Sequence, residues 1–281
     1  MTGEVIAGHG PVIAGLTGNL SAAAFAPAIA LWREWNAKIN VISRKDEDNI
    51  YAHHILHSLA IYEYLQRHYV FQVGQNSSHL EQNRPFLSPV GQKSAHLEQG
   101  AVAPEGRATR GTEAGGPSRR AGGVSEANSR RGKQPPVAIL DLGTGGGFPG
   151  IPLAIAMPEA QFTLCDSIGK KVRVAQAVAD GLGLKNVKCV QARAEELPGQ
   201  WDWVVSRAVT SLENLYPWVK GRFRRSIICL KGGDVASEID ALQKRFKSPA
   251  ENIRVWPISE WLPDDPYSAE KFVVEISAQA L

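Results

Sequence analysis

Apolar residues in the second half of the chain come in short runs, separated by longer stretches whose apolar positions repeat with helical spacing. The short runs predict strands at residues 137–141, 161–165, 187–191, 201–206, 226–231, 252–256 and 271–276. The stretches between them predict helices at residues 149–157, 169–182, 212–221 and 234–247. Strands that alternate with helices are typical of an α/β protein with a mostly parallel sheet and helices on both faces.

The first part of the chain, residues 1–71, predicts a helical extension. Helical patterns cover residues 21–36 and 46–68, and Asp46 is a plausible N-cap of the second helix. The apolar positions of that second helix are Ile50, Leu56, Leu59 and Leu65.

An unusual insertion at residues 72–136 separates the extension from the α/β part, residues 137–281. It contains a near-repeat, residues 73–82 and 90–99, and is then rich in Gly, Ala, Ser, Pro and Arg. Its nine Lys or Arg and five Asp or Glu give it a charge of +4, whereas the whole chain carries +3. The basic balance therefore comes from the insertion and is no evidence for a basic folded domain.

Residues 100–136 include almost no large apolar residues. Such a segment cannot bury enough apolar surface to offset the entropy lost on ordering, so we expect a disordered, solvated linker. The alternative is an arm that contacts RNA through its arginines, Arg107, Arg110, Arg119, Arg120, Arg130 and Arg131.

Composition excludes several classes of protein. The most apolar stretch, residues 22–31, is about half as long as a membrane span. A signal peptide begins with a positively charged region, and no Lys or Arg precedes Arg33. The three cysteines follow apolar runs, and no Cys/His spacing indicates a metal site, so we expect them to be reduced and buried. A cytoplasmic protein is the simplest interpretation.

The most informative motif is the glycine-rich run at residues 141–150, Asp-Leu-Gly-Thr-Gly-Gly-Gly-Phe-Pro-Gly. It lies between a predicted strand and a predicted helix, which is the context of nucleotide-binding turns. Glycines let the backbone turn sharply and approach a ligand, and the following helix offers unpaired N–H groups. The glycine spacing by itself is weak evidence, because a tight turn that binds nothing would also satisfy it.

A second acidic position strengthens the case for a nucleotide. Asp166 ends the next predicted strand, 25 positions after Asp141, where a carboxylate can accept hydrogen bonds from ribose hydroxyls. NAD and S-adenosylmethionine both satisfy this geometry, and Asp141 favours the second, whose cationic amino acid end suits a carboxylate. The alternative is that both aspartates only cap strand ends.

Polar residues end five consecutive predicted strands: Asp141, Asp166, Arg193 with Glu195, Ser206 with Arg207, and Lys231. Ligands of parallel sheets bind beyond the carboxyl ends of the strands, so we expect these groups to converge on one site.

Taken in order, residues 141–154, 164–171, 192–196 and 206–208 resemble the small-subunit (16S) ribosomal RNA guanine-N7 methyltransferases, also called the glucose-inhibited division protein B family. Residues 35–40 and 54–58 resemble the helical entry segment of that family. The resemblance implies a Rossmann-like class I methyltransferase with a seven-stranded sheet. It also implies an enzyme that transfers a methyl group from S-adenosylmethionine to N7 of one guanine in 16S ribosomal RNA.

The resemblance also implies roles for particular residues. The positions that match cofactor contacts are Gly143, Phe148, Asp166, Ala194, Glu195 and Arg207. The candidates for RNA binding, as naked 16S RNA or within the small ribosomal subunit, are Asn40, His54, Arg193 and Lys231. Arg207 and Arg193 are candidates for positioning the reactants, by holding phosphate or carboxylate groups. Phe148 would otherwise be an ordinary packing residue.

Two features depart from the family pattern. His53 and His57 stand where the family has Arg and Asp, and the insertion replaces a short connection. A metal site at these histidines lacks a third ligand, so we expect His53, His54 and His57 to be exposed on a helix. Two other functions stay open: a methyltransferase with another RNA or a small molecule as acceptor, and a non-catalytic binding module associated with the ribosome.

Overall fold

The computed structural model describes residues 25–69, 135–247 and 250–278. Apart from Pro135, these residues belong to one unit, formed by Met1–Val90 and Pro136–Leu281. Most of the predicted linker, including its arginines, lies outside the described residues, as does the beginning of the first predicted helix.

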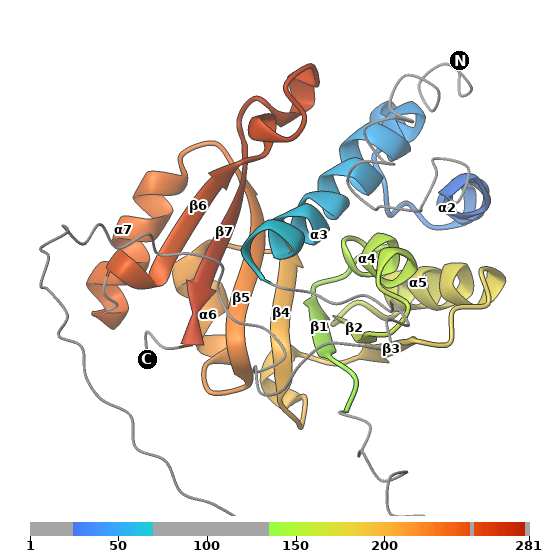
Figure 1. Ribbon diagram of the computed structural model, residues 1–281. Coiled ribbons are helices and arrows are strands. Elements are labelled where there is room, and N and C mark those ends of the chain that lie inside the picture. The colour runs from blue at the N-terminus through green and yellow to red at the C-terminus, as the bar shows by residue number, and fades with distance from the viewer. Residues whose placement is uncertain (1–24, 70–134, 248–249, 279–281) are drawn as a thin grey trace, which may run out of the picture. The chain divides into compact units, whose positions relative to one another are not determined.

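All seven predicted strands are present and form one sheet (Figure 1). They are β1 (Ala138–Leu142), β2 (Gln161–Asp166), β3 (Val187–Gln191), β4 (Trp201–Arg207), β5 (Phe223–Gly232), β6 (Ile253–Pro257) and β7 (Lys271–Ser277). Their order is β3-β2-β1-β4-β5-β7-β6. The first five strands are parallel, and only β7 runs antiparallel to its neighbours β5 and β6. The expected mostly parallel, seven-stranded Rossmann-like sheet is confirmed.

Helices cover both faces of this sheet. Successive residues of each strand point to opposite faces, so each strand contributes to two separate cores. Ile139 of β1 belongs to the core that packs against α2 (Ala26–Lys38), α3 (His57–His68), α4 (Gly150–Ala156) and α5 (Gly169–Gly181). The next residue, Leu140, belongs to the core that packs against α6 (Leu212–Val219) and α7 (Val235–Phe246). The four predicted helices of the α/β part are confirmed, with ends shifted by one or two residues.

The predicted helix at residues 46–68 is instead three consecutive elements. They are a 3₁₀ helix η2 (Arg44–Asn49), a π-helix η3 (Ile50–Leu56) and the α-helix α3. The prediction that Asp46 is an N-cap is wrong: it lies inside η2, and its carboxylate bonds to two imidazoles instead of backbone N–H groups. The predicted apolar positions of this segment are all buried.

Two buried sets of hydrogen bonds help to fix the extension against the α/β part. At one, the hydroxyls of Tyr64 and Tyr69 donate to Glu275 of β7, which is fully buried and also accepts from Ser226 at 2.5 Å. At the other, the indole N–H of Trp32 in α2 donates to the Gly146 carbonyl at 2.7 Å. A buried carboxylate and a buried carbonyl both require such partners, so these contacts fix where the extension lies on the sheet.

Two smaller expectations concern the cysteines and the membrane. All three cysteines are free, and Cys165 and Cys229 are buried, whereas Cys189 on the edge strand β3 is only partly buried. Within the described ranges, no helix combines the length and the apolar character that a membrane span needs.

Candidate cofactor pocket

The glycine turn between β1 and α4 adopts backbone conformations that favour glycine. Gly143, Gly145 and Gly147 have φ values of +71°, +57° and +108°. The N–H groups of Gly143 and Thr144 both donate to the Cys165 carbonyl, at 2.8 and 3.0 Å, which ties the turn to β2. A Cβ on Gly145 would meet nothing within 4 Å, so the backbone at this point faces open space. The turn is therefore built to bring backbone close to a ligand.

A pocket of about 420 Å³ lies beside this turn. Its lining includes all the predicted cofactor positions and Arg193, namely Gly143, Phe148, Asp166, Arg193, Ala194, Glu195 and Arg207. They come from the carboxyl ends of β1 to β4, whereas Asp141, Ser206 and Lys231, which we expected to converge on the same site, do not line the pocket. The volume lies in the range of pockets that bind small molecules and cofactors.

Asp166 lies at the end of β2 with its carboxylate aimed at the turn. Its Oδ2 accepts from the Gly145 N–H at 3.0 Å and its Oδ1 from the Ile168 N–H at 2.9 Å. A carboxylate has about four acceptor sites, so this one keeps capacity for further donors from the pocket. Two backbone bonds fix the orientation in which it would meet them.

Asp141 does not line this pocket, although the sequence favoured it as a partner for a cationic ligand. It is fully buried, and its Oδ2 accepts from the Gly150 N–H at 2.8 Å, at the start of α4. Burial raises the pKa of this carboxyl to about 7, against the opposing effect of its hydrogen bonds. That earlier interpretation is corrected: Asp141 holds the beginning of α4 beneath the turn.

Phe148 and Arg207 form one wall of the pocket together with the N-terminal extension. Phe148 is 3% exposed and stacks on Trp32, with ring centroids 4.2 Å apart. The Arg207 guanidinium lies 4.9 Å from the centre of the Phe148 ring and contacts His53 and His54. Phe148 is therefore both a packing residue and a pocket residue.

The short helix η4 (Ala194–Glu196) also contributes to the pocket lining, through Ala194 and Glu195. Arg222 holds η4 by donating to the carbonyls of Ala194 at 3.0 Å and Glu195 at 2.5 Å, and to the carbonyl of Leu197. Arg193, next to η4, is exposed at the pocket.

The four RNA-binding candidates differ in their surroundings. Asn40 and Arg193 are exposed, and Asn40 precedes the pocket residue Val41. Both ring nitrogens of His54 are engaged, by Asp46 and by Arg207. The Lys231 side chain is 8% exposed, pairs with Glu238 at 2.8 Å and donates to the Thr210 carbonyl, outside the pocket.

The expectation of exposed histidines is wrong. His57 is 5% exposed and packs edge-on against Tyr267, with ring centroids 5.6 Å apart. The side chains of His53 and His54 are 24% and 13% exposed. They pack inward because Asp46 and Tyr267, from two other segments, cover this face of the helix.

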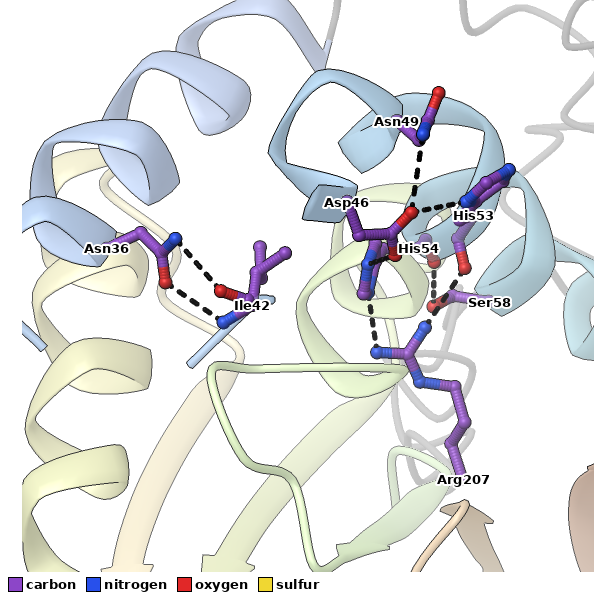
Figure 2. A network of polar contacts seen from close by, with 8 residues as sticks. All are labelled: Asn36, Ile42, Asp46, Asn49, His53, His54, Ser58 and Arg207. Atoms are coloured by element: carbon purple, nitrogen blue, oxygen red, sulfur yellow. Dashed lines mark hydrogen bonds and ion pairs between the residues drawn. The ribbon is translucent and has the colours of Figure 1, made fainter. Parts of the chain in front are cut away.

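Sequence reasoning missed pocket residues that have no polar chemistry. Val41, Ile168, Val209 and Trp218 all line the pocket. Val41 is placed by Asn36, whose side-chain oxygen accepts from the Val41 N–H at 2.9 Å. The same side chain accepts from the Ile42 N–H at 2.9 Å and donates to the Ile42 carbonyl at 3.0 Å (Figure 2). The buried asparagine near the end of a helix was the only signal that this segment is held in a fixed conformation.

Comparisons with known proteins agree with the resemblance seen in the sequence. Residues 124–256 match the family described as rRNA small subunit methyltransferase G. The chain is 35% identical over 263 residues to the ribosomal RNA small subunit methyltransferase G of Flavobacterium psychrophilum, covering 91% of this chain and 90% of that one. It is 38% identical over 222 residues to the protein of the same name from Bacteroides thetaiotaomicron, covering 76% of each. Among solved structures, magnesium protoporphyrin IX methyltransferase of Synechocystis PCC 6803 aligns with a TM-score of 0.40 and 17% identity, over 51% of this chain and 70% of that one.

Proposed function

Because this chain belongs to the ribosomal RNA small subunit methyltransferase G family, we propose that it transfers a methyl group from S-adenosylmethionine to N7 of one guanine in 16S ribosomal RNA. The observation that carries the proposal is the pocket in which the glycine turn, Asp166 and Arg207 meet. An RNA acceptor supports a reaction in the cytoplasm, on 16S RNA or on the small ribosomal subunit.

The pocket residues fit this cofactor. The backbone at Gly145 borders open space, and Asp166 keeps acceptor capacity for ribose hydroxyls. Ile168, two residues after Asp166, also lines the pocket and is 42% exposed, which offers an apolar surface to an adenine ring. Gly143, Phe148, Ala194 and Glu195 would complete the contacts, through backbone on one side and η4 on the other.

The chemistry suits a site without an acid/base pair. S-adenosylmethionine supplies the methyl group on a positively charged sulfur. Guanine N7 attacks with an in-plane lone pair and has no proton to lose, so no general base is required. The chain's residues mainly have to align the acceptor nitrogen with the methyl carbon, and such alignment is worth about 7–11 kcal/mol in well-ordered cases.

The two arginines at the pocket should therefore act away from the reacting ring. Positive charge moves onto the purine during transfer, and a cation against its edge would oppose that change. The Arg207 guanidinium is instead held against Phe148 and His54, where it can meet the carboxylate of the cofactor. Exposed Arg193 and Asn40 are suited to hold phosphate and sugar groups of the RNA.

The decisive experiment uses purified protein, labelled S-adenosylmethionine and small ribosomal subunits that lack the modification. We expect label at N7 of one guanine in 16S RNA, mapped by nucleotide analysis. Label in another RNA or in a small molecule alone would replace the acceptor in this proposal. An absence of cofactor binding by calorimetry would refute methyl transfer altogether.

A further inference from the structure

The Arg207 guanidinium is held by residues that lie some 150 positions earlier in the chain. Its Nη2 donates to Nδ1 of His54 at 2.9 Å and its Nη1 donates to the His53 carbonyl at 3.3 Å. Figure 2 shows the guanidinium reaching up from the end of β4 to meet these two groups of η3. The position of this pocket residue thus depends on the N-terminal extension.

The direction of these hydrogen bonds fixes the protonation of His54. An arginine side chain has only donors, so Nδ1 of His54 must accept with a free lone pair. The ring proton is then on Nε2, which faces Oδ2 of Asp46 at 2.7 Å. Burial and the nearby Arg207 charge also lower the pKa of His54 to about 4, which agrees with a neutral ring.

Asp46 is the charged end of this arrangement. Although burial opposes ionisation, hydrogen bonds from His53 and His54 lower the pKa of Asp46, so it is a carboxylate. Among the residues that the structure describes, Arg207 has no carboxylate within ion-pair distance. Hydrogen bonds link Asp46 to Arg207 only through the neutral imidazole of His54, so the orientation of the guanidinium is fixed while its donors are not taken up by a protein carboxylate.

The π-helix explains how two adjacent histidines serve one carboxylate. Nδ1 of His53 lies 2.5 Å from Oδ1 of Asp46, and Nε2 of His54 lies 2.7 Å from Oδ2. Neighbouring residues of an α-helix point about 100° apart, and the wider turn of η3 narrows this angle, which helps both rings to reach the same carboxylate. π-Helical turns are rare and frequently occur at functional sites.

We propose that Asp46 and His54 are positioning residues of this enzyme, acting in series to hold the Arg207 guanidinium against the cofactor pocket. This deepens the proposed function and rests on it only in assigning the cofactor as the ligand of Arg207. His54 is thereby reassigned from an RNA contact to a link between Asp46 and Arg207.

Three variants of His54 separate the two halves of this link. In His54→Asn the amide oxygen reaches about as far as Nδ1 and keeps an acceptor for Arg207. In His54→Gln the amide reaches about as far as Nε2 and keeps only the donor to Asp46, and His54→Phe removes both. His68→Asn, at the far end of α3 and outside the pocket lining, is the matched control.

Calorimetry with S-adenosylmethionine measures the consequence. We expect the dissociation constant to rise about 10- to 100-fold in the Gln and Phe variants, as loss of one hydrogen bond to a charged group implies. The Asn variant should bind several-fold better than the Gln variant, and His68→Asn should bind like the wild type. If His54 has a purely structural role, cofactor binding should weaken in proportion to the loss of thermal stability, and that result would overturn the proposal. A Gln variant that binds the cofactor better than the Asn variant would also overturn it.

A spectroscopic measurement tests the link without any ligand. In the ¹⁵N spectrum of histidine-labelled protein at neutral pH, the signal lost in His54→Asn should show protonated Nε2 and unprotonated Nδ1. A proton on Nδ1, or a doubly protonated ring, would refute the positioning role even if the enzyme methylates RNA. Conversely, the expected tautomer would support the link from Asp46 to Arg207 even if the wild type fails to bind the cofactor. A failure to bind the cofactor would refute only the proposed function.

Discussion

Gly143 gives a prediction whose size follows from the structure. An alanine Cβ there would lie 2.3 Å from Cγ2 of Val209, and the residue has φ +71°. The left-handed backbone costs a non-glycine residue about 1–2 kcal/mol, and overpacking adds about 1–3 kcal/mol. We expect Gly143→Ala to lower the free energy of unfolding by roughly the sum of these two costs.

The two costs can be separated, because the clash involves one side chain. Val209 lines the pocket and is 36% exposed, so it can yield only by moving the pocket wall. Gly143→Ala should therefore also weaken binding of S-adenosylmethionine. Combining it with Val209→Ala should recover about 1–3 kcal/mol of stability, the part due to overpacking, and leave the backbone cost.

Gly183→Ala is the matched control for backbone strain. Gly183 has φ +67°, but a Cβ there would meet nothing within 4 Å, and it lies outside the pocket lining. Denaturant unfolding and calorimetry with the cofactor should show about 1–2 kcal/mol of lost stability and unchanged binding. If Gly143→Ala behaves like this control, or if Val209→Ala restores no stability to it, then the close approach of Val209 is not what requires glycine at Gly143.

Three further predictions test other parts of the site. Trp32→Phe keeps an aromatic ring beside Phe148 but leaves the Gly146 carbonyl without its donor, and should cost about 1–3 kcal/mol of stability by denaturant unfolding; an unchanged value would refute the anchor. Asp141→Asn should gain stability relative to the wild type as the pH rises from 3.8 towards about 7. In that window the raised pKa makes the folded wild type bind more protons than the unfolded chain, so the wild type loses stability as the pH rises. If the difference in free energy of unfolding between the two proteins does not change with pH, the buried carboxyl is contradicted. Deleting residues 100–134 should leave the cofactor dissociation constant unchanged, and a selective loss of methyl transfer to small subunits would favour the RNA-contacting arm.

The parts of the fold that sequence predicted are those set by local pattern. Short apolar runs located every strand, including the edge strands β3 and β6, in which no residue is fully buried. The start of β5 at Phe223 was missed because Arg224 and Arg225 interrupt the apolar run while the backbone continues the strand. The glycine turn was recognised because its positive φ values at Gly143 and Gly147 favour glycine, and this preference is local.

The site residues that sequence misjudged are those whose partners lie far away in the chain. Asp46 has the local signature of an N-cap, but two imidazoles offer its carboxylate better-placed donors. His57 would be exposed on an isolated helix, and Tyr267, 210 positions later, buries it. Asp141 shares the strand-end position of Asp166, yet its side chain turns towards α4 and not into the pocket. Local rules give the type of residue at a site but not the direction in which it faces.

The N-terminal extension contributes to the cofactor pocket through three residues, and this makes cofactor binding and docking of the extension thermodynamically linked. Val41 lines the pocket, Trp32 holds the Gly146 carbonyl, and His54 holds Arg207. A ligand that binds only when the extension is docked stabilises the docked state by its binding free energy at the concentration used. At about 100 times the dissociation constant this is about 2.7 kcal/mol. Amides of α2 and η3 that exchange by local opening should then exchange about 100-fold more slowly with S-adenosylmethionine, whereas those of α7, on the other face of the sheet, should not change. Hydrogen exchange that slows only in the sheet and the glycine turn would show that the extension merely covers a pocket complete without it.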